Sequence, residues 1–296
     1  PPGTSPVRET TAGDAIWGAA FSPDGRLALY ASMDGLLYAD EVATGRRVQS
    51  FAGHTDGVTS VAVATRGGPI LSGGLDGTLR LWDLPSGRAL RRLEGHEGRV
   101  FRVALSADGR HAVSGGEDQT VRLWDVASGH EVRRFEGHAG WVTGVAFAPD
   151  GRAVVSCGDD GTVQLWDVDT GAERRRYEGH GGSVKSVVFS PDGGRILSGG
   201  EDGTVRLWDV VSGRELWRFT GHTDWVRDVA FSPQGDRVLT ASDDETLRLL
   251  RADTGVEVAC LQGPTASFLC VAVSPDGRRA LSGSDDARAR LWELPR

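Results

Sequence analysis

The chain has 296 residues, of which 39% are hydrophobic and 25% charged, as expected for a soluble globular protein. Its 33 basic and 41 acidic residues give a formal net charge of −8, which argues against non-specific attraction to nucleic acid or anionic lipid. No apolar run approaches the ~18 residues needed to cross a membrane, and no secretory signal is visible. We therefore expect a cytoplasmic protein.

The cysteines and the start of the chain bear on its context. Cys157, Cys260 and Cys270 form no CxxC motif, and we expect buried, reduced thiols, with a Cys260–Cys270 disulfide as the alternative. The chain begins PPGTSP and has a single methionine, Met33, and a single lysine, Lys185. We expect a piece of a longer protein, whose first residues resemble the end of an interdomain linker.

Three short motifs recur at a strict step of 42 residues. Gly-His pairs stand at 53–54, 95–96, 137–138, 179–180 and 221–222. Trp-Asp pairs stand at 82–83, 124–125, 166–167 and 208–209, and Trp-Glu at 292–293 lies two steps further. Turns of the SPDG type stand at 22–25, 106–109, 148–151, 190–193, 232–235 and 274–277. An internal period of 20–50 residues indicates a repeat architecture.

One repeat, residues 179–220, contains four candidate strands. They read VKSVVFS, RILSGG, TVRLWDV and RELWRF, and each is bounded by turn residues. Four short strands form one small antiparallel sheet that cannot bury both its faces alone. Stacking such sheets around an axis solves this problem, so the repeat is interpreted as a propeller blade.

The GH…WD spacing, the SPDG turn and the hairpin SGGxDGTxxLWD resemble the WD40 repeat family over nearly the whole chain. The resemblance implies an all-β, seven-bladed β-propeller of four-stranded antiparallel blades, with residues 1–296 as a single domain. Seven units of 42 residues nearly exhaust the chain. Innermost strands are expected at about 16–21, 58–63, 100–105, 142–147, 184–189, 226–231 and 268–273.

The last unit ends at LWELPR, after its third strand. Residues of about 4–10, TSPVRET, occupy the place of a fourth strand when the period is shifted back. We expect them to pair with strand 289–294 and close the ring, so that residues 1–12 are a linker plus the closing strand. Pro6 is tolerable on an outer strand.

Four units carry a full set of residues that, by resemblance to WD40 proteins, form a hydrogen-bonded chain of histidine, serine, aspartate and tryptophan. The sets are His54, Ser72, Asp76, Trp82; His96, Ser114, Asp118, Trp124; His138, Ser156, Asp160, Trp166; and His180, Ser198, Asp202, Trp208. Each indole N–H needs an acceptor once buried.

Three units depart from this pattern. The sixth has His222, Thr240 and Asp244 with Leu250 in place of tryptophan; the seventh has Ser282, Asp286 and Trp292 with Pro264 in place of histidine; the first has Asp34 with Ala12, Tyr30 and Asp40. We expect the first blade and the last two to be the less stable part of the ring.

No catalytic constellation is visible. A catalytic triad needs one nucleophile on a strained turn, whereas four Ser–His–Asp sets lie in four blades and no GxSxG occurs. The stepped histidines lie on different blades, too far apart to share a zinc ion. The acidic pairs lack a calcium-loop layout, and SGGEDG lacks the GK[ST] of a phosphate loop. We expect no enzyme activity, metal, cofactor or small-molecule substrate.

Positions where the repeats differ are the candidates for function. The third and fifth residues after each histidine position open, by resemblance to WD40 propellers, onto the face around the central channel where peptides dock. They predict a basic-aromatic partner-binding set of Trp17, Arg99, Phe101, Trp141, Lys185, Trp225 and Arg227, surrounded by Glu117, Asp159, Glu201, Asp243 and Asp285. The alternative is that Trp17 and Phe101 pack between blades while the arginines are solvated.

The outermost strands carry a second cluster of arginines, namely Arg91, Arg92, Arg133, Arg134, Arg174, Arg175, Arg176 and Arg218. They form either a nucleic-acid belt or, as we expect, charged edges that block strand association, with Glu94, Glu136 and Glu178 as counter-ions. A fall in DNA affinity with rising salt would distinguish the two.

The function predicted from the sequence is a non-catalytic platform that binds a protein or peptide partner, monomeric as an isolated domain. The regular repeat and the preference for arginine over lysine resemble bacterial WD40 domains joined to a signalling or effector module. The alternatives are a purely structural spacer or regulatory domain and, after these, a nucleic-acid binder or an enzymatic propeller.

Overall fold

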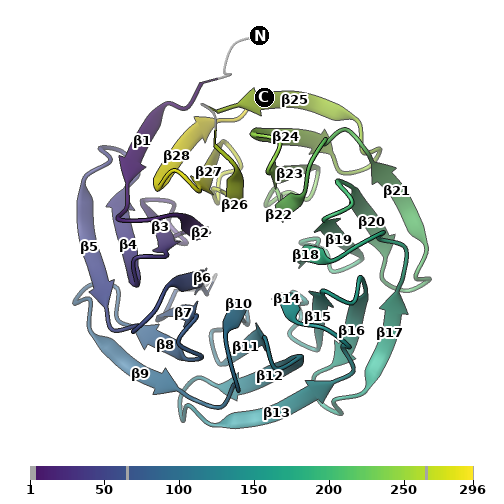
Figure 1. Ribbon diagram of the computed structural model, residues 1–296, viewed down its shortest axis with the longest axis horizontal. Helices are drawn as coiled ribbons and strands as arrows, with labels where there is room; N and C mark the ends of the chain where they lie inside the picture. Colours follow the sequence, from purple (N-terminus) through teal and green to yellow (C-terminus); the bar gives the residue numbers. More distant parts are fainter. Residues whose placement is uncertain (1–4, 65–66, 264–265, 296) are drawn as a thin grey trace.

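The computed structural model describes residues 5–64, 67–263 and 266–295, which fold into seven four-stranded sheets arranged as a ring (Figure 1). Each sheet extends outward from a central channel, so the sheets are the blades of a β-propeller. The predicted all-β, seven-bladed propeller is therefore confirmed. The described residues include no helix, and so none that is long and apolar enough to cross a membrane.

The innermost strands have the predicted bounds, and the second strands follow the SPDG-type turns. The innermost strands are β2 (Ile16–Phe21), β6 (Val58–Val63), β10 (Val100–Leu105), β14 (Val142–Phe147), β18 (Val184–Phe189), β22 (Val226–Phe231) and β26 (Phe268–Val273). The second strands are β3 (Leu27–Ser32), β7 (Ile70–Gly74), β11 (His111–Gly116), β15 (Ala153–Gly158), β19 (Arg195–Gly200), β23 (Arg237–Ser242) and β27 (Arg279–Ser284).

The third strands carry the Trp-Asp motif, and the outermost strands form the rim. The third strands are β4 (Leu36–Glu41), β8 (Leu79–Trp82), β12 (Thr120–Asp125), β16 (Val163–Asp167), β20 (Val205–Asp209), β24 (Thr246–Arg251) and β28 (Arg288–Glu293). The outermost strands are β5 (Arg47–Ala52), β9 (Ala89–Leu93), β13 (Glu131–Glu136), β17 (Glu173–Tyr177), β21 (Glu215–Phe219), β25 (Glu257–Gln262) and β1 (Arg8–Thr11). Blades are numbered below by their innermost strand in chain order.

The SPDG turn explains why each inner strand reverses where it does. Pro191 presets φ for the turn, and Gly193 takes φ +72°, where a side chain would be strained. The hydroxyl of Ser190 donates to Asp192 and accepts the backbone N–H of Arg195 at 2.9 Å. The chain therefore passes from β18 to β19 with the polar groups of the turn satisfied.

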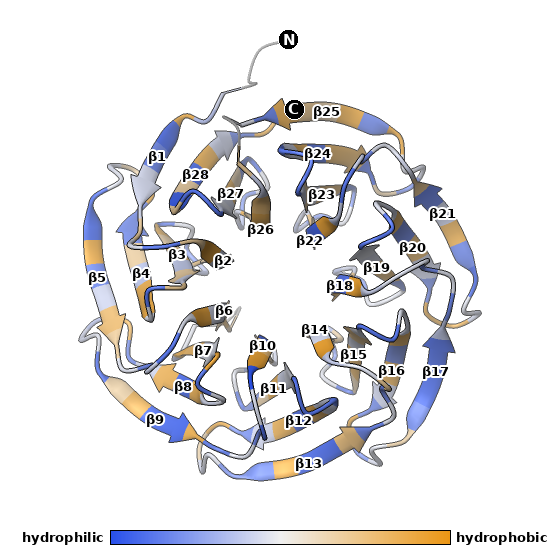
Figure 2. Ribbon diagram, in the orientation of Figure 1, coloured by the Kyte–Doolittle hydropathy of each residue, from blue (hydrophilic) through white to orange (hydrophobic). Residues whose placement is uncertain are grey.

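The core lies between neighbouring blades. Leu197 and Leu207 of the fifth blade pack against Val226 and Val229 of the sixth, and all four are buried. Burying such a side chain contributes about 1.5–3 kcal/mol, and seven clusters of this kind follow the ring. A β-carbon on Gly199 would lie 2.6 Å from Val226, so this close approach requires glycine. In Figure 2 the innermost strands carry orange, apolar segments.

The ring closes as predicted, through an N-terminal strand beside β28 (Figure 1). The strand is shorter than the expected 4–10, since pairing runs from Arg8, opposite Leu291, to Thr11, opposite Arg288. Thr4 lies outside the described residues, and Pro6 has no N–H to donate. Glu9 joins Arg288 at 2.6 Å and the fully buried Arg290 at 2.9 Å, which adds ion pairs to the backbone ladder.

Candidate partner-binding face

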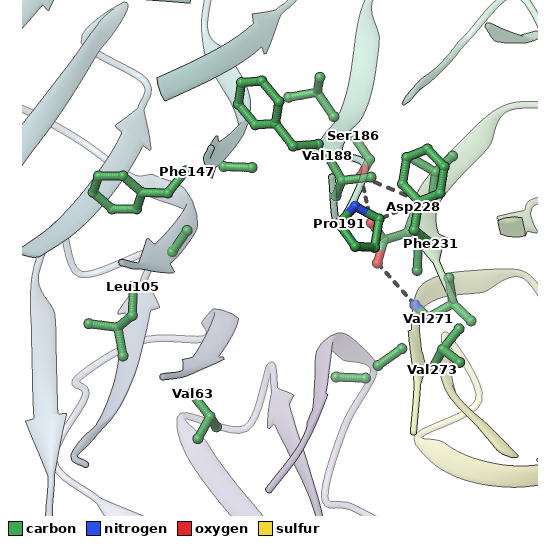
Figure 3. Close-up of a pocket in the computed structure, with 18 of the residues that line it drawn as sticks. Val63, Leu105, Phe147, Ser186, Val188, Pro191, Asp228, Phe231, Val271 and Val273 are labelled. Atoms are coloured by element: carbon green, nitrogen blue, oxygen red, sulfur yellow. Dashed lines mark hydrogen bonds between the residues drawn. The ribbon is translucent and has the colours of Figure 1, made fainter. Parts of the chain in front are cut away.

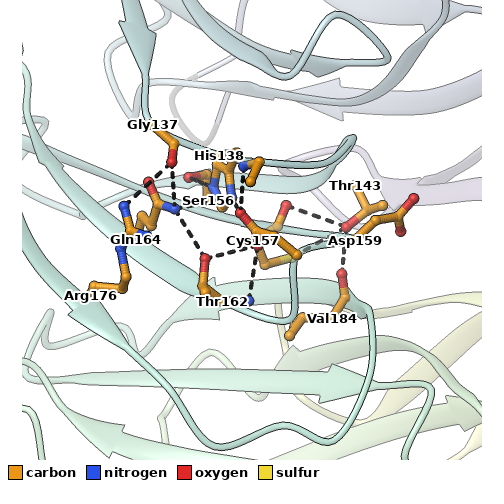
Figure 4. A network of polar contacts seen from close by, with 12 residues as sticks. Gly137, His138, Thr143, Ser156, Cys157, Asp159, Thr162, Gln164, Arg176 and Val184 are labelled. Carbon is orange, nitrogen blue, oxygen red and sulfur yellow. Dashed lines mark hydrogen bonds and ion pairs between the residues drawn. The ribbon is translucent and has the colours of Figure 1, made fainter.

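Loops and turns at one end of the channel form the face that the sequence singled out. In the fourth blade, the loop before β14 and the β15–β16 turn are tied together by His138 (Figure 4). Its Nε2 lies 2.7 Å from Ser156 Oγ and its Nδ1 lies 2.8 Å from Asp160. The indole of Trp166 donates to the same Ser156 hydroxyl at 2.8 Å. These hydrogen bonds fix the loop that carries Trp141. The Trp141 carbonyl also accepts the backbone N–H of Asp159, which joins this loop to the β15–β16 turn.

The structure joins the other three complete sets in the same way. Histidine Nε2 lies 2.7–2.8 Å from serine Oγ, and the indole donates to that serine at 2.8–2.9 Å. Burial by itself would raise the pKa of each aspartate, but the histidine contact and backbone N–H donors outweigh it. The pKa is therefore held well below its ordinary value in Asp76, Asp118, Asp160 and Asp202.

The irregular units replace the missing contacts by others. Thr240 lies 2.7 Å from His222 and donates to a backbone carbonyl where the sixth blade has Leu250 in place of tryptophan. In the first blade the hydroxyl of Tyr30 contacts both Asp40 and Arg47. Pro264 of the seventh lies outside the described residues. The expectation that these blades are less stable remains a prediction.

Five of the seven predicted partner-binding residues line one cavity of about 190 Å³ at the mouth of the channel, namely Trp17, Phe101, Trp141, Lys185 and Arg227. In every blade the fifth residue after the histidine position lines this cavity. Thr59, Thr143 and Leu269 are the ones that are not among the predicted partner-binding residues. Three tryptophans remain accessible, with Trp17 exposed by 40%, Trp141 by 41% and Trp225 by 37%. The rings of Phe101 and Trp141 stack with centroids 5.4 Å apart.

The remaining two predicted residues, Trp225 and Arg99, do not line this cavity. Trp225 receives two cations over its indole, with the Arg227 guanidinium 4.6 Å and the Lys185 ammonium 5.5 Å from a ring centroid. Such contacts contribute about 0.5–1 kcal/mol at exposed sites. Arg99 is exposed and lies 3.9 Å from Glu117.

The predicted acidic surround neutralises the cations of the cavity. Lys185 Nζ lies 3.2 Å from Asp159 and 2.8 Å from Glu201. Arg227 contacts both carboxylate oxygens of Asp243, with its closest ion-pair distance 2.6 Å. The basic-aromatic centre therefore presents aromatic surface and ion pairs rather than free positive charge.

The floor of the cavity is an ion pair that sequence reasoning missed. Arg102 of β10 reaches across the channel to Asp228 of β22 and to the Ser186 hydroxyl of β18, the latter at 3.2 Å. Asp228 also accepts the Ser186 hydroxyl at 2.6 Å and the backbone N–H of Val271 at 3.0 Å (Figure 3). Burial alone would lower the pKa of the Arg102 guanidinium, but the Asp228 carboxylate outweighs it and raises that pKa.

This pair separates the mouth of the channel from a wider chamber beneath it. Arg102 lines both the mouth cavity and a second cavity of about 750 Å³. The inner-strand ends and the turn prolines, among them Pro149, Pro191 and Pro233, line the lower chamber (Figure 3). Arg102 therefore lies between the mouth cavity and the lower chamber.

A signal for this floor exists in the repeat. A β-bulge near the start of each inner strand is followed by a residue directed at the channel axis, as shown by Arg102 and Asp228. Stepping by 42, this position reads Gly18, Ser60, Arg102, Gly144, Ser186, Asp228 and Cys270. Arg102 is the only cation and Asp228 the only anion at this position, and they lie three blades apart among small residues. This pattern is the sequence signal for the ion pair across the channel.

Comparison with known families follows the blades closely. The family model of the WD domain, G-beta repeat, matches residues 5–38, 45–83, 87–125, 129–167, 171–209, 213–250 and 255–293. The chain belongs to the WD-repeat family. No curated protein sequence matches it. WD-repeat propellers are typically protein–protein interaction modules and are generally non-catalytic.

The rim arginines of this WD-repeat propeller are already engaged. Arg91, Arg133 and Arg175 each donate to two carbonyls in the next blade's turn between its third and outermost strands, at 2.8–3.2 Å. The other five pair with carboxylates: Arg92 with Glu94, Arg134 with Glu131, Arg174 with Asp167, Arg176 with Glu173 and Arg218 with Glu215. Glu131 and Glu173 form the direct ion pairs with Arg134 and Arg176, and the expected counter-ions Glu136 and Glu178 add a weaker attraction that also raises the pKa of these two guanidinium groups.

The cysteines of the propeller are free, and two are buried. The expected Cys260–Cys270 alternative, a disulfide, is therefore absent from the structure. Burial raises the pKa of the Cys157 thiol to about 12 and raises that of Cys270 further. Within the described ranges, no three His, Cys, Asp or Glu side chains are grouped so as to hold a metal ion.

Proposed function

We propose that this WD-repeat propeller is a non-catalytic interaction module that binds a protein or peptide partner at the mouth of its channel. The observation that carries the proposal is the cavity formed by Trp17, Phe101 and Trp141 with Lys185 and Arg227, drawn from five separate blades. Accessible tryptophan and arginine around a cavity are the residue types that dominate binding free energy at protein interfaces.

The scaffold supports such a role because it holds these side chains rigidly. Histidine-centred hydrogen bonds fix the loops of the face in five blades, and the Arg102–Asp228 pair crosses the channel below them. A preorganised surface loses less conformational entropy when a partner binds. We further propose that the domain is monomeric, since arginine and glutamate side chains along the outermost strands disfavour edge-to-edge pairing with another copy.

The setting of the module is also a proposal. Three free thiols favour the reducing cytoplasm. The regular repeat and its arginine preference favour the interaction module of a larger bacterial signalling or effector protein. The engagement of the rim arginines favours a protein partner over nucleic acid.

The test compares capture of lysate proteins by the native chain and by the Trp141→Ala/Trp225→Ala/Arg227→Ala variant. A matched control carries Leu90→Ala, Val132→Ala and Leu216→Ala, three exposed apolar residues of the rim. A hot-spot residue contributes about 2 kcal/mol or more, so we expect the channel-face variant alone to lose a specific partner. Equal capture by all three proteins would move the site elsewhere, and no capture would favour a structural spacer.

A further inference from the structure

On the candidate face the cations are paired with carboxylates, whereas several carboxylates form no ion pair in the described structure. This difference indicates the chemistry of the partner. Lys185 and Arg227 each lie within 2.8 Å of a carboxylate, and Arg99 lies 3.9 Å from Glu117. At the floor, Arg102 is bound to Asp228. An anionic group entering the cavity would have to compete with the carboxylate that each of these cations already holds.

Acidic side chains on the same loops are exposed and form no ion pair within the described part of the chain. They are Asp14, Asp56, Glu97, Asp224, Glu245 and Asp285. They stand in the loops that enter the innermost strands and in the turns between second and third strands, which lie at one end of the channel because their backbones hydrogen-bond to each other. The face therefore carries a surplus of uncompensated negative charge around an electrically balanced centre.

The cavity inside this acidic ring suits one uncharged side chain. Its walls are the aromatic rings of Trp17, Phe101 and Trp141 with the apolar Leu269. A cavity of about 150 Å³ is enough to hold benzene, so about 190 Å³ accommodates one large apolar or aromatic side chain. A cationic side chain at this depth would lie close to Arg102, Lys185 and Arg227.

We propose that the partner is a basic peptide segment that inserts one uncharged, apolar or aromatic side chain into the cavity. Its lysine or arginine residues then lie against the surrounding carboxylates. The inference rests on the proposed function of the channel face and adds the chemical class of the partner. Attraction between the ring and the segment also accelerates association at low salt.

Selection from a phage-displayed library of random nonapeptides tests this inference. The immobilised native chain is the bait, and phage that also bind the Trp141→Ala/Trp225→Ala/Arg227→Ala variant are removed. We expect the enriched peptides to carry a net positive charge and a large apolar residue. Their synthetic forms should lose about tenfold or more in affinity between 50 and 500 mM NaCl, as salt screens exposed charges.

Removing charge from the exposed acidic residues around the cavity provides a second measurement with the same selected peptides. Asp56→Asn/Asp224→Asn/Asp285→Asn should weaken binding at least fivefold while leaving the melting temperature unchanged, because these carboxylates form no ion pairs in the described structure. The control Glu41→Gln/Asp150→Asn/Asp169→Asn removes equal charge from the opposite end of the blades and should keep full affinity.

The outcomes separate the two proposals. Two outcomes would overturn the proposal of a basic partner while leaving the channel face as the binding site. One is enrichment of acidic or uncharged peptides, and the other is equal affinity of the native chain and the Asp56→Asn/Asp224→Asn/Asp285→Asn variant. Failure to enrich any peptide that distinguishes the native chain from the channel-face variant would overturn both.

Discussion

Arg102 and Asp228 bond to each other across the central channel, although 126 residues separate them in the chain. The third and sixth blades, which share no backbone pairing, are thereby joined directly. Asp228 is 7% exposed and Arg102 20% exposed, so both charges are substantially withdrawn from water. Arg102 also lines the candidate binding cavity, and its bond to Asp228 is part of the framework of the ring.

Replacing Arg102 by methionine should lower the free energy of unfolding by about 2–3 kcal/mol, because the Asp228 carboxylate loses its cation at a nearly buried site. Adding Asp228→Asn to Arg102→Met should recover at least about 1 kcal/mol, since the unpaired charge is then removed. Urea unfolding of the native chain, both single variants and the double variant measures this coupling. Additive losses would show that the pair contributes no interaction of its own.

The contrast between this pair and the inner strands shows what the sequence can predict. The 42-residue step places every inner strand correctly, because alternation and turn residues such as Pro191 and Gly193 act locally. The positions lining the cavity follow from the same step. The contact between Arg102 and Asp228 depends on the diameter of the closed ring and on side-chain reach, which no local pattern specifies.

The rim shows the same limit. The sequence places Arg133 on an outermost strand, where it lies half-buried. Its donation to the carbonyls of Asp169 and Thr170 in the next blade requires the relative placement of two sheets. Likewise, the bonds among Tyr30, Asp40 and Arg47 replace a missing set in a way that the repeat pattern does not anticipate.

Gln164→Arg should stabilise the fourth blade. At the equivalent position of the third blade, Arg122 is buried and contacts Asp118 at 2.9 Å and Glu131 at 2.7 Å. The fourth blade has the corresponding acids, Asp160 and Glu173, but Gln164 leaves its buried Oε1 without a hydrogen-bond partner.

We expect a gain of about 1 kcal/mol for Gln164→Arg, seen as a rise of about 2 °C or more in melting temperature. The reciprocal control, Arg122→Gln, should lower the melting temperature, since it leaves Asp118 and Glu131 without their buried cation. A Gln164→Arg protein that melts below the native chain would contradict the equivalence of the two blades.

Acid should unfold the propeller steeply below about pH 4. Burial alone would raise the pKa of the histidine-bound aspartates, but their hydrogen bonds hold each folded-state pKa well below its ordinary value. These residues are Asp76, Asp118, Asp160, Asp202 and Asp244. The unfolded chain binds these protons near pH 3.9 and the folded chain only at lower pH. The stability that these groups contribute is therefore complete above that value and is lost as pH falls from it toward the lower folded-state pKa values.

Each such carboxyl contributes a slope of about 1.4 kcal/mol per pH unit in that window. Urea unfolding measured at intervals from pH 5 to pH 2.5 should show the cumulative slope. In Asp118→Asn the slope should fall by one carboxyl's share, and the stability at pH 7 should fall as well, because the amide lacks the charge that His96 contacts. An unchanged slope in this variant would exclude Asp118 as a source of the acid response.

Removing residues 1–12 should lower the melting temperature by several degrees, because it deletes β1 and leaves the outer edge of β28 unpaired. Glu9→Gln should cause a smaller loss, since it removes only the ion pairs with Arg288 and the buried Arg290. Glu41→Gln, which breaks no ion pair in the described structure, is the control for a lost negative charge. Differential scanning calorimetry of the four proteins measures this. We expect the highest melting temperature for the native chain and the control, an intermediate one for Glu9→Gln and the lowest for the truncated chain. If the truncated chain melts at the native temperature, ring closure by β1 contributes nothing to stability.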